Sequence, residues 1–292
     1  DSRMGRQSET YGEDPTLAAA LGTAYTNGVQ EGETAGRKAE SVAKHFLGFH
    51  NSQGGIHGAN CDIPERLLNE VYGKPFQASI SEANLRGIMP CYSSINGEPL
   101  SSSHKMLTGL LREEMGFDGV CAADYGAVGN VFHVQKVGES VTEAGLMCME
   151  AGMDVEMQNC VGFNEELKEW FRSGRANMEI LDRAVRRILE AKFRMGIFEH
   201  PYALENEALQ EAFYRKEDEG ILLRAALESL ILLKNNGVLP FNPNGRKIAV
   251  VGCHAQNARC FFGGYTHISM MEAVHAVANS IAGMKAGSVE GR

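Results

Sequence analysis

The chain has 292 residues, of which 43% are hydrophobic and 22% charged, so it can bury a sizeable core and does not have the composition of a disordered polypeptide. Its formal net charge is −9 and no run of Lys and Arg stands out, which argues against nucleic acid and anionic membranes as partners and is compatible with a neutral ligand. No apolar stretch approaches the roughly 20 residues that a membrane-spanning helix needs.

Strand-like and helix-like segments alternate along the chain to about residue 196. Strands are expected at Val42–Phe46, at Leu85–Tyr92, before Asp124 and at Met153–Met157. Helices are expected at Ile63–Ala83, Lys105–Met115, Glu139–Ala151, Phe163–Ser173 and Met178–Met195. The last of these is the clearest, with an apolar face formed by Leu181, Val185, Ile188, Leu189 and Phe193, and with Gly196 placed to end it. Strands that alternate with helices of ten or more residues predict βα units and a parallel sheet.

The number of βα units predicts part of a barrel. Four units fit before residue 196, whereas a complete (β/α)8 barrel needs roughly 250 residues. We therefore expect an α/β fold in which residues 1–196 form the C-terminal portion of a TIM-like barrel whose first part is missing from this chain.

The remaining residues predict a linker and the beginning of another domain. Residues 197–244 are expected to be a linker with one helix, Lys216–Lys234, ending near Leu239-Pro240. Lys247–Gly252 is fully apolar after its first residue, as buried parallel strands are, and Met270–Ala282 could be its helix. A single βα unit cannot bury its own faces, so residues 245–292 are expected to begin a second, truncated α/β sandwich domain.

Seven cysteines occur without a CxxC pair or a repeating frame. Their number is odd and several lie in apolar patterns, which favours buried free thiols and a reducing, cytoplasmic compartment. A zinc site is not expected, because Cys253, His254 and Cys260 lack a second ligand pair at a suitable spacing.

Asp124 is the most informative residue of the chain. A run of small apolar residues follows Gly119 and stops on this lone carboxylate, which is how an inner strand of a (β/α) barrel delivers a catalytic acid to its C-terminal rim. Asp also caps helices and turns routinely, so the local pattern leaves both interpretations open.

Several stretches together resemble family three of the glycoside hydrolases, the group of β-glucosidases and β-xylosidases. The motifs span nearly the whole chain in the order and spacing of the family. They are Asp1–Arg6 with Glu9–Pro15 (resembling Asp-Pro-Arg-x-Gly-Arg…Glu-x-x-x-Glu-Asp-Pro), Lys44-His45-Phe46, Asp118-Gly119 leading to Asp124-Tyr125, and Glu228–Asn235 through Leu239-Pro240.

This resemblance implies a retaining mechanism with a covalent glycosyl-enzyme intermediate, and Asp124 matches the nucleophile. The general acid/base of the family is usually a glutamate in the second domain, beyond the end of this chain, so no residue is nominated for it. No metal and no cofactor are implied. Ala123 stands where serine is common in the family and Tyr125 where tryptophan is common.

Four further residues match positions that bind the sugar in the family: Arg6, Lys44, His45 and Tyr92. Each has a structural alternative. Arg6 could pair with Glu9 or Glu13, Lys44 could form a salt bridge at the rim, His45 could be a satisfied core histidine, and Tyr92 could be core packing.

The glycine-rich loop Phe49–His57 resembles a family subgroup with Ala-Ser-Glu-Gly-Gly at this place and is expected to border the sugar pocket. Gln53 replaces the acidic residue there; a glutamine can donate and accept hydrogen bonds but carries no charge. His57 does not reproduce the Asp-Ser-His triplet of the N-acetylglucosaminidase branch and is interpreted as a loop residue rather than a catalyst. Glu156 could face the pocket or form a buried ion pair.

The resulting hypothesis is an exo-acting retaining β-glycosidase that releases terminal β-D-glucose. The alternatives are a β-xylosidase or α-L-arabinofuranosidase of the same fold, and a non-catalytic carbohydrate-binding homologue. The expected partners are an oligosaccharide or β-glycoside substrate and the remaining part of the enzyme, which could be another chain. A homo-oligomer is possible.

Overall fold

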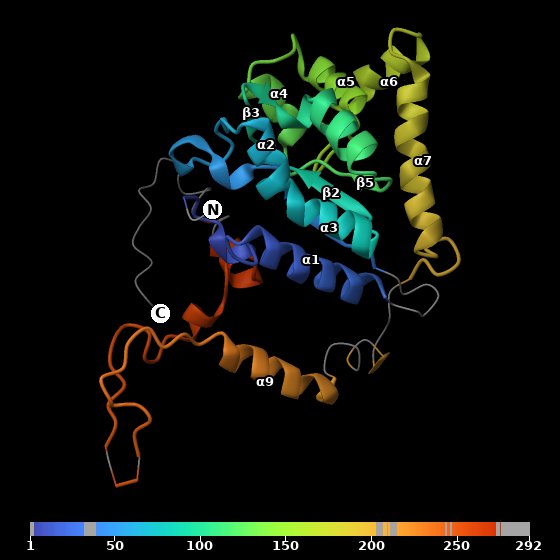
Figure 1. Ribbon diagram of the computed structural model, residues 1–292. Helices are drawn as coiled ribbons and strands as arrows, with labels where there is room; N and C mark the ends of the chain where they lie inside the picture. Colours follow the sequence, from blue (N-terminus) through green and yellow to red (C-terminus); the bar gives the residue numbers. More distant parts are fainter. Residues whose placement is uncertain are drawn as a thin grey trace. The chain divides into compact units, whose positions relative to one another are not determined.

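The fold was analysed in a computed structural model, which describes residues 3–31, 39–202, 215–242 and 247–272, together with positions 207, 208, 210, 244, 245 and 275 (Figure 1). The chain divides into two compact units, Asp1–Asn206 and Glu207–Arg292. No described helix is both long enough and apolar enough to cross a membrane.

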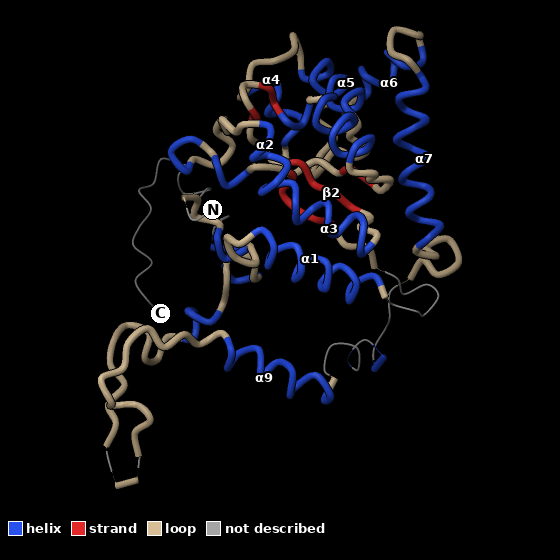
Figure 2. Tube along the Cα trace, in the orientation of Figure 1, coloured by secondary structure: helices blue, strands red, loops and turns tan. Residues whose placement is uncertain are grey.

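The first unit is built around a parallel sheet with the strand order β1-β2-β5 (Figure 2). Its strands are β1 (Val42–Phe46), β2 (Gly87–Pro90) and β5 (Val120–Cys121). Val42 pairs with Gly87, which in turn pairs with Val120, so the three strands start in register and their carboxyl ends meet at one edge. The predicted strand Met153–Met157 is reduced to a single parallel bridge between Val155 and Ala122. The predicted α/β class with parallel strands is confirmed.

Helices connect these strands. They are α1 (Pro15–Gln30) before β1; α2 (Glu65–Leu67), the π-helix η4 (Leu68–Gly73) and α3 (Lys74–Ala83) between β1 and β2; the π-helix η6 (Lys105–Glu114) before β5; and α4 (Ala127–His133), α5 (Val141–Ala151), α6 (Glu165–Arg172) and α7 (Met178–Arg194) after it. Short elements fill the loops: η1 (Gln7–Glu9), η2 (Phe49–Asn51), η3 (Gln53–Gly55), the hairpin β3 (Ser94–Ile95) and β4 (Glu98–Pro99), and η5 (Leu100–Ser102). The five predicted helices before residue 196 are all present.

Local sequence signals set the ends of the longest helices. The side chain of Asp14 accepts hydrogen bonds from the backbone N–H groups of Thr16 and Leu17 and so caps α1. Asn177 caps α7 in the same way, and Gly196 follows that helix with φ of 69°. The predicted apolar face of α7 is only partly used, because Phe193 is 62% exposed while Ala184 and Ala191 are buried.

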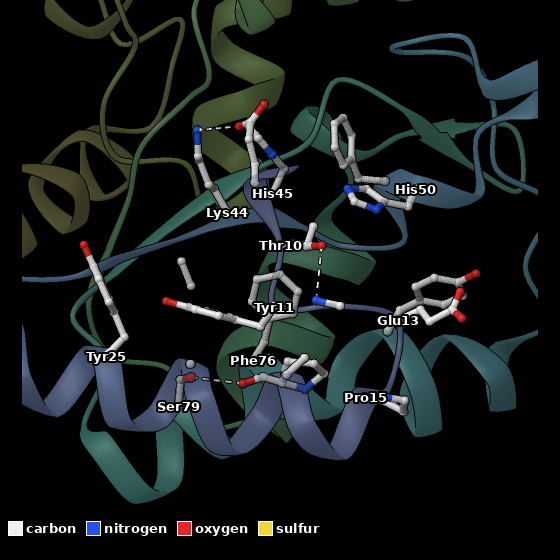
Figure 3. A pocket seen from close by; sticks show the side chains of 18 of the residues that line it. Thr10, Tyr11, Glu13, Pro15, Tyr25, Lys44, His45, His50, Phe76 and Ser79 are labelled. Carbon is white, nitrogen blue, oxygen red and sulfur yellow. Dashed lines mark hydrogen bonds and ion pairs between the residues drawn. The ribbon is translucent and has the colours of Figure 1, made fainter. Parts of the chain in front are cut away.

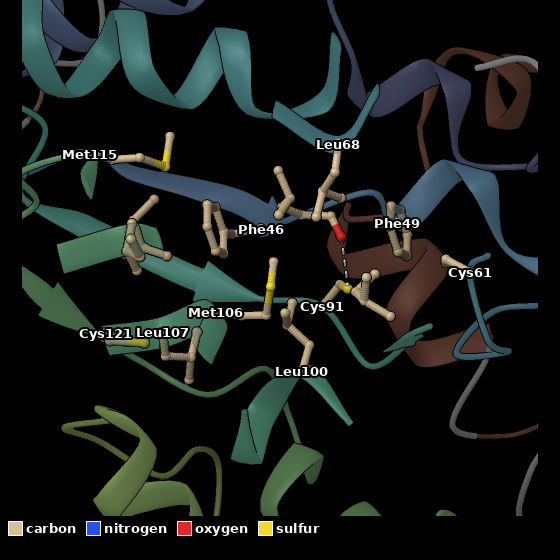
Figure 4. Close-up of a cluster of buried hydrophobic side chains, with 14 of the residues drawn as sticks. Phe46, Phe49, Cys61, Leu68, Cys91, Leu100, Met106, Leu107, Met115 and Cys121 are labelled. Carbon is tan, nitrogen blue, oxygen red and sulfur yellow. Dashed lines mark hydrogen bonds between the residues drawn. The ribbon is translucent and has the colours of Figure 1, made fainter. Parts of the chain in front are cut away.

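The main core lies around β1 and β2 (Figure 4). Phe46 of β1, Leu47 directly after it and Ile88 of β2 are completely buried, and Leu107 and Leu111 of η6 belong to the same cluster. Full burial of such a side chain is worth about 1.5–3 kcal/mol relative to exposure, so this cluster holds the sheet to its helices.

Cys61, Cys91, Cys121 and Cys148 are buried free thiols, as predicted, whereas the free thiols of Cys160 and Cys253 are exposed. Burial raises the pKa of Cys91 and of Cys121 to about 12, so both thiols stay protonated.

A buried ion network fixes the strand that leads to Asp124. Asp154, whose side chain is 1% exposed, accepts hydrogen bonds from Arg112 (2.8 Å), from Arg187 on α7 (2.9 Å) and from the backbone N–H of Cys121 (2.9 Å). The neighbouring Glu156 accepts instead from backbone N–H groups of residues 162 and 163, so the buried ion pair considered for Glu156 belongs to Asp154.

The second unit contains the helices η7 (Lys216–Asp218), α9 (Glu219–Glu228) and η8 (Ala258–Phe261). The predicted helix Lys216–Lys234 therefore ends six residues early. The predicted strand Lys247–Gly252 is wrong: these residues are irregular and Val251 is 85% exposed. A parallel strand is stable only beside other strands, and no strand accompanies this segment within the described part of the second unit. Most of the predicted helix Met270–Ala282 falls outside the described residues.

Candidate functional site

The carboxyl edge of the sheet brings together the side chains that the sequence singled out. Lys44 and His45 lie in the last half of β1, Tyr92 follows β2 by two residues, and Asp124 follows β5 by three. Since the parallel strands start in register, these positions converge although up to 80 residues separate them in sequence. Arg6 reaches the same place from the segment before α1.

Asp124 is held by hydrogen bonds on both carboxylate oxygens. Its Oδ2 lies 3.3 Å from Nε2 of His45, and its Oδ1 accepts from the backbone N–H of Tyr125 at 2.7 Å. Partial burial, the largest single influence on this group, disfavours the charge, but the hydrogen bonds from His45, the Tyr125 backbone and Tyr92 outweigh it and lower the pKa of Asp124 below 3.8. The carboxylate is therefore ionised at neutral pH.

Asp124 does not cap the following helix. The N-cap of α4 is Gly126, with φ of 72° and no side-chain capping bond. Backbone bonds instead tie this turn to the neighbouring segment: Ala123 N–H donates to the Val155 carbonyl (2.8 Å) and Gly126 N–H to the Met157 carbonyl (2.9 Å). The capping alternative is wrong for α4, and the carboxylate is left pointing toward His45.

Glu9 links the two basic residues that were predicted to bind sugar. Its carboxylate accepts from Nε and Nη2 of Arg6, both at 2.6 Å, and from Nζ of Lys44 at 3.2 Å. These bonds, first among them that from Arg6, lower the pKa of Glu9 to about 2. The structural pairings considered for Arg6 and Lys44 are thus real, and both pairings run through Glu9.

Arg6 also contacts the histidine and the ring beneath it. Its Nη2 lies 3.4 Å from Nε2 of His45, and its guanidinium carbon lies 5.2 Å from the centre of the Phe49 ring. The side chain of His45 is 5% exposed, so this imidazole is buried between Arg6, Phe49 and Asp124. The cluster formed by Arg6, Glu9, Lys44, His45, Tyr92 and Asp124 is called the carboxylate cluster below.

Tyr92 joins the carboxylate cluster through its hydroxyl. The hydroxyl donates to the carbonyl of Tyr125 at 2.8 Å and also lies within hydrogen-bonding reach of Asp124. A phenol has one proton, so these two acceptors share it. Its ring packs against the core beside α4, which is the packing role considered for this residue.

A cavity of about 460 Å³ borders one end of the carboxylate cluster (Figure 3). It lies between β1, α1 and α3, and Glu9, Lys44 and His45 line it together with the rings of Tyr11, Tyr25 and Phe76. Asp124 and Tyr92 do not line it. The cavity therefore does not mark the position of a group that reacts with Asp124.

The sequence of the first unit has a clear family relationship. Residues 1–191 match the family model of the glycosyl hydrolase family 3 N terminal domain. The chain belongs to glycosyl hydrolase family 3. The resemblance predicted from the motifs is confirmed.

Curated family 3 relatives carry two kinds of name. A β-xylosidase of Formosa agariphila is 34% identical over 279 residues, covering 91% of this chain and 38% of the relative. A β-glucosidase of Rhizobium radiobacter is 34% identical over 284 residues, covering 97% of this chain and 31% of the relative. The chain thus spans about a third of the length of these relatives.

Solved structures of β-glucosidases agree with the fold. A β-glucosidase from Listeria innocua superposes with a TM-score of 0.75 at 32% identity, covering 82% of this chain and 33% of that protein. A β-glucosidase from intestinal bacteria, described as involved in saponin metabolism, superposes with a TM-score of 0.77 at 33% identity and covers 84% of this chain and 32% of that protein.

Sequence reasoning did not nominate two residues that the structure places at this site. Glu9 was considered only as a structural partner of Arg6, and the signal that could have found it is its spacing of three residues from Arg6. His57 was interpreted as a loop residue, and it is exposed, but its ring contacts Phe49 and Tyr92. Gln53 donates to Asp62 at 2.5 Å and takes no part in the carboxylate cluster.

No group of three or more His, Cys, Asp or Glu side chains among the described residues could hold a metal ion.

Proposed function

We propose that the protein to which this chain belongs is an exo-acting retaining β-glycosidase that releases terminal β-D-glucosyl residues, with Asp124 as its nucleophile. The observation that carries the proposal is the ionised Asp124 carboxylate, which is bonded to His45, the side chain that Nη2 of Arg6 approaches to 3.4 Å. A nucleophile of this kind has to be charged at the working pH, and its neighbours stabilise that charge.

The chemistry proceeds in two displacements. One carboxylate oxygen of Asp124 attacks C1 of the bound sugar, the C1–O bond to the leaving group breaks, and a glycosyl ester forms while the leaving oxygen takes a proton from a general acid. Water then attacks C1, gives its proton to the same group, and releases the sugar and the Asp124 carboxylate. Arg6, Lys44 and His45 are proposed to bind sugar hydroxyls. Arg6 and Lys44 carry charged donors, which form stronger hydrogen bonds than neutral ones.

The general acid is not Glu9. A retaining enzyme needs its second carboxyl about 5–5.5 Å from the nucleophile and protonated before the first step. Glu9 is the acid of the carboxylate cluster besides Asp124, and its pKa of about 2 leaves it without a proton at neutral pH. We propose that the second domain of the protein supplies the acid.

The parallel strands support a proposal for the domain architecture. Residues 1–196 would form part of a (β/α)8 barrel whose C-terminal rim carries the carboxylate cluster, as barrel enzymes arrange their sites. Residues 197–244 would be a linker, and residues 245–292 would begin an α/β sandwich domain.

Replacing Asp124 by Asn in the complete protein tests the proposed nucleophile. We expect kcat for nitrophenyl β-D-glucoside to fall by several orders of magnitude, and a 2-fluoro glucoside to label the peptide that contains Asp124 in the unsubstituted protein. Near-normal turnover by the Asn variant, or a label on another residue, would refute the assignment. No turnover of any glycoside by the unsubstituted protein would favour a carbohydrate-binding homologue.

A β-xylosidase is the second candidate, because the Formosa agariphila relative and a Xylanibacter ruminicola relative that is 32% identical over 272 residues carry that name. A panel of nitrophenyl β-D-glucoside, β-D-xyloside and α-L-arabinofuranoside separates the candidates. The highest kcat/KM on the xyloside or the arabinofuranoside would replace glucose in the proposal and leave the role of Asp124 unchanged.

A further inference from the structure

His57 lies against the same rings that support the carboxylate cluster. The centre of its ring is 5.0 Å from that of Tyr92 and 5.3 Å from that of Phe49, and both pairs are T-shaped. Tyr92 reaches Asp124 with its hydroxyl, and Phe49 lies under the guanidinium of Arg6. The imidazole therefore contacts two rings that themselves contact Asp124 and Arg6, which are proposed to act on the substrate.

The loop that carries His57 has a specified conformation. Gly54, Gly55 and Gly58 have φ values of 65°, 67° and 83°, which side chains other than that of glycine rarely adopt. A Cβ atom on Gly55 would lie 2.5 Å from the carbonyl oxygen of Arg3. Backbone hydrogen bonds close the loop, from the N–H at position 53 to the carbonyl at position 60 (2.9 Å) and from position 59 to position 56 (3.1 Å). His57 is thus presented by a fixed loop rather than by a random turn.

The ring of His57 is suited to bind a hydroxyl group. The residue is exposed, and within the described part of the chain its ring nitrogens make no hydrogen bond. Partial burial of the ring, followed by the positive charges of Arg6 and His45, lowers the pKa of His57, and these influences outweigh the opposite effect of Asp124 and Glu9. The imidazole is therefore neutral at pH 7 and offers one donor and one acceptor, which matches a sugar hydroxyl.

The position of His57 indicates that it contacts the leaving group of the substrate. His45 and Asp124 are the buried side of the carboxylate cluster, with side-chain exposures of 5% and 14%, whereas His57 lies on its solvent side. In an exo-acting enzyme the terminal sugar enters the buried side, and the leaving group extends toward solvent. We propose that His57 is a specificity-determining residue that hydrogen-bonds a hydroxyl of a sugar leaving group; this rests on the function proposed above.

The test compares two substrates in the complete protein. One is cellobiose, whose leaving group is a sugar, and the other is nitrophenyl β-D-glucoside, whose leaving group has no hydroxyl to bind. The measured quantity is the ratio of kcat/KM for cellobiose to kcat/KM for the nitrophenyl glucoside. In His57→Phe, which keeps a ring against Tyr92 and Phe49 but has no hydrogen-bonding atom, we expect this ratio to fall about three- to tenfold, the range of one neutral hydrogen bond. His57→Gln, which keeps a donor and an acceptor, should recover part of the loss.

A matched control is His50→Phe. The ring of His50 also contacts Phe49, at 4.9 Å, but lines the cavity that Asp124 and Tyr92 do not reach. We expect the ratio of kcat/KM for cellobiose to that for the nitrophenyl glucoside to stay within twofold of its value in the unsubstituted protein. An unchanged ratio in His57→Phe, or an equal loss in His50→Phe, overturns the assignment. If the proposed glucosidase function itself fails, the unsubstituted protein cleaves neither substrate, so the two failures are distinguishable.

Discussion

Replacing Glu9 by Gln tests whether the carboxylate cluster works as a charge-balanced unit. The substitution preserves size and removes the negative charge that bridges Arg6 and Lys44. Without it, the two cations repel each other and lose the bonds that fix their orientation. We expect weaker sugar binding, seen mainly as a rise in KM, because Arg6 and Lys44 are proposed to bind the sugar before and during the reaction.

The size of the effect follows from the pKa of Glu9. The cluster lowers this pKa from 4.5 to about 2, and a pKa difference of one corresponds to about 1.4 kcal/mol, so the ionised form gains about 3 kcal/mol. Glu9 and Arg6 keep 22% of their side-chain surface exposed, and solvent weakens such pairs. We therefore expect the substitution to weaken substrate binding by about half of that free energy. That loss corresponds to a decrease of about tenfold in kcat/KM.

The assay is steady-state hydrolysis of nitrophenyl β-D-glucoside by the complete protein. Glu165→Gln is the matched control, since Glu165 pairs with Lys168 on the surface of α6 and its side chain is 84% exposed. The control should keep kcat/KM within twofold. If Glu9→Gln also stays within twofold while Arg6→Met does not, the bridge has no role in holding Arg6, and the reasoning is refuted.

Three further predictions concern the residues around Asp124. Tyr92→Phe removes the hydroxyl shared with Asp124, so the pKa of Asp124 should rise and kcat/KM should fall about tenfold, the cost of a hydrogen bond to a charged group; an unchanged pH profile would contradict this. Because the pKa of Asp124 lies below its ordinary 3.8, the carboxylate should stay ionised as pH falls to about 4. Any loss of kcat/KM between pH 7 and 5 should therefore come from a group other than Asp124 or Glu9, and the same loss should be seen in Glu9→Gln. Asp154→Asn leaves Arg112 and Arg187, whose side chains are 8% and 18% exposed, without their shared carboxylate, and should cost about 3–5 kcal/mol, or roughly ten degrees in Tm by calorimetry. Asp118→Asn, at a 74% exposed carboxylate, should change Tm by no more than about two degrees.

The elements of the first unit could be predicted because their periodicity and end signals agree. Helix α7 begins at Met178 and ends before Gly196, as expected, and the structure adds Asn177 as its cap. The segment Lys247–Gly252 has an equally strong strand pattern, yet it is irregular. A helix satisfies its own backbone hydrogen bonds, whereas a strand depends on neighbours that a local pattern does not reveal.

The candidate site could be predicted in part, for a similar reason. Lys44, His45, Tyr92 and Asp124 lie near the ends of parallel strands, and topology alone brings such positions to one edge. Glu9 and His57 lie in segments without periodicity, where the side-chain contacts depend on local turns and on glycine conformations. Apart from the spacing of three residues between Arg6 and Glu9, the sequence carries no information about those contacts.

The charges of the carboxylate cluster also restrict the position of the general acid in the proposed mechanism. Arg6 and Lys44 lower the pKa of any carboxyl in contact with them, as they do for Glu9, whereas a general acid needs a raised pKa. In the proposed mechanism, the acid would therefore have to approach C1 from the side away from these cations. Glu9→Gln should consequently lower kcat/KM by the same factor for glucosides with good and with poor leaving groups, because protonation of the leaving oxygen is untouched. A loss that grows as the leaving group becomes more basic would instead identify Glu9 as part of the proton-donating machinery, and the assignment of two separate roles to the two carboxylates would be wrong.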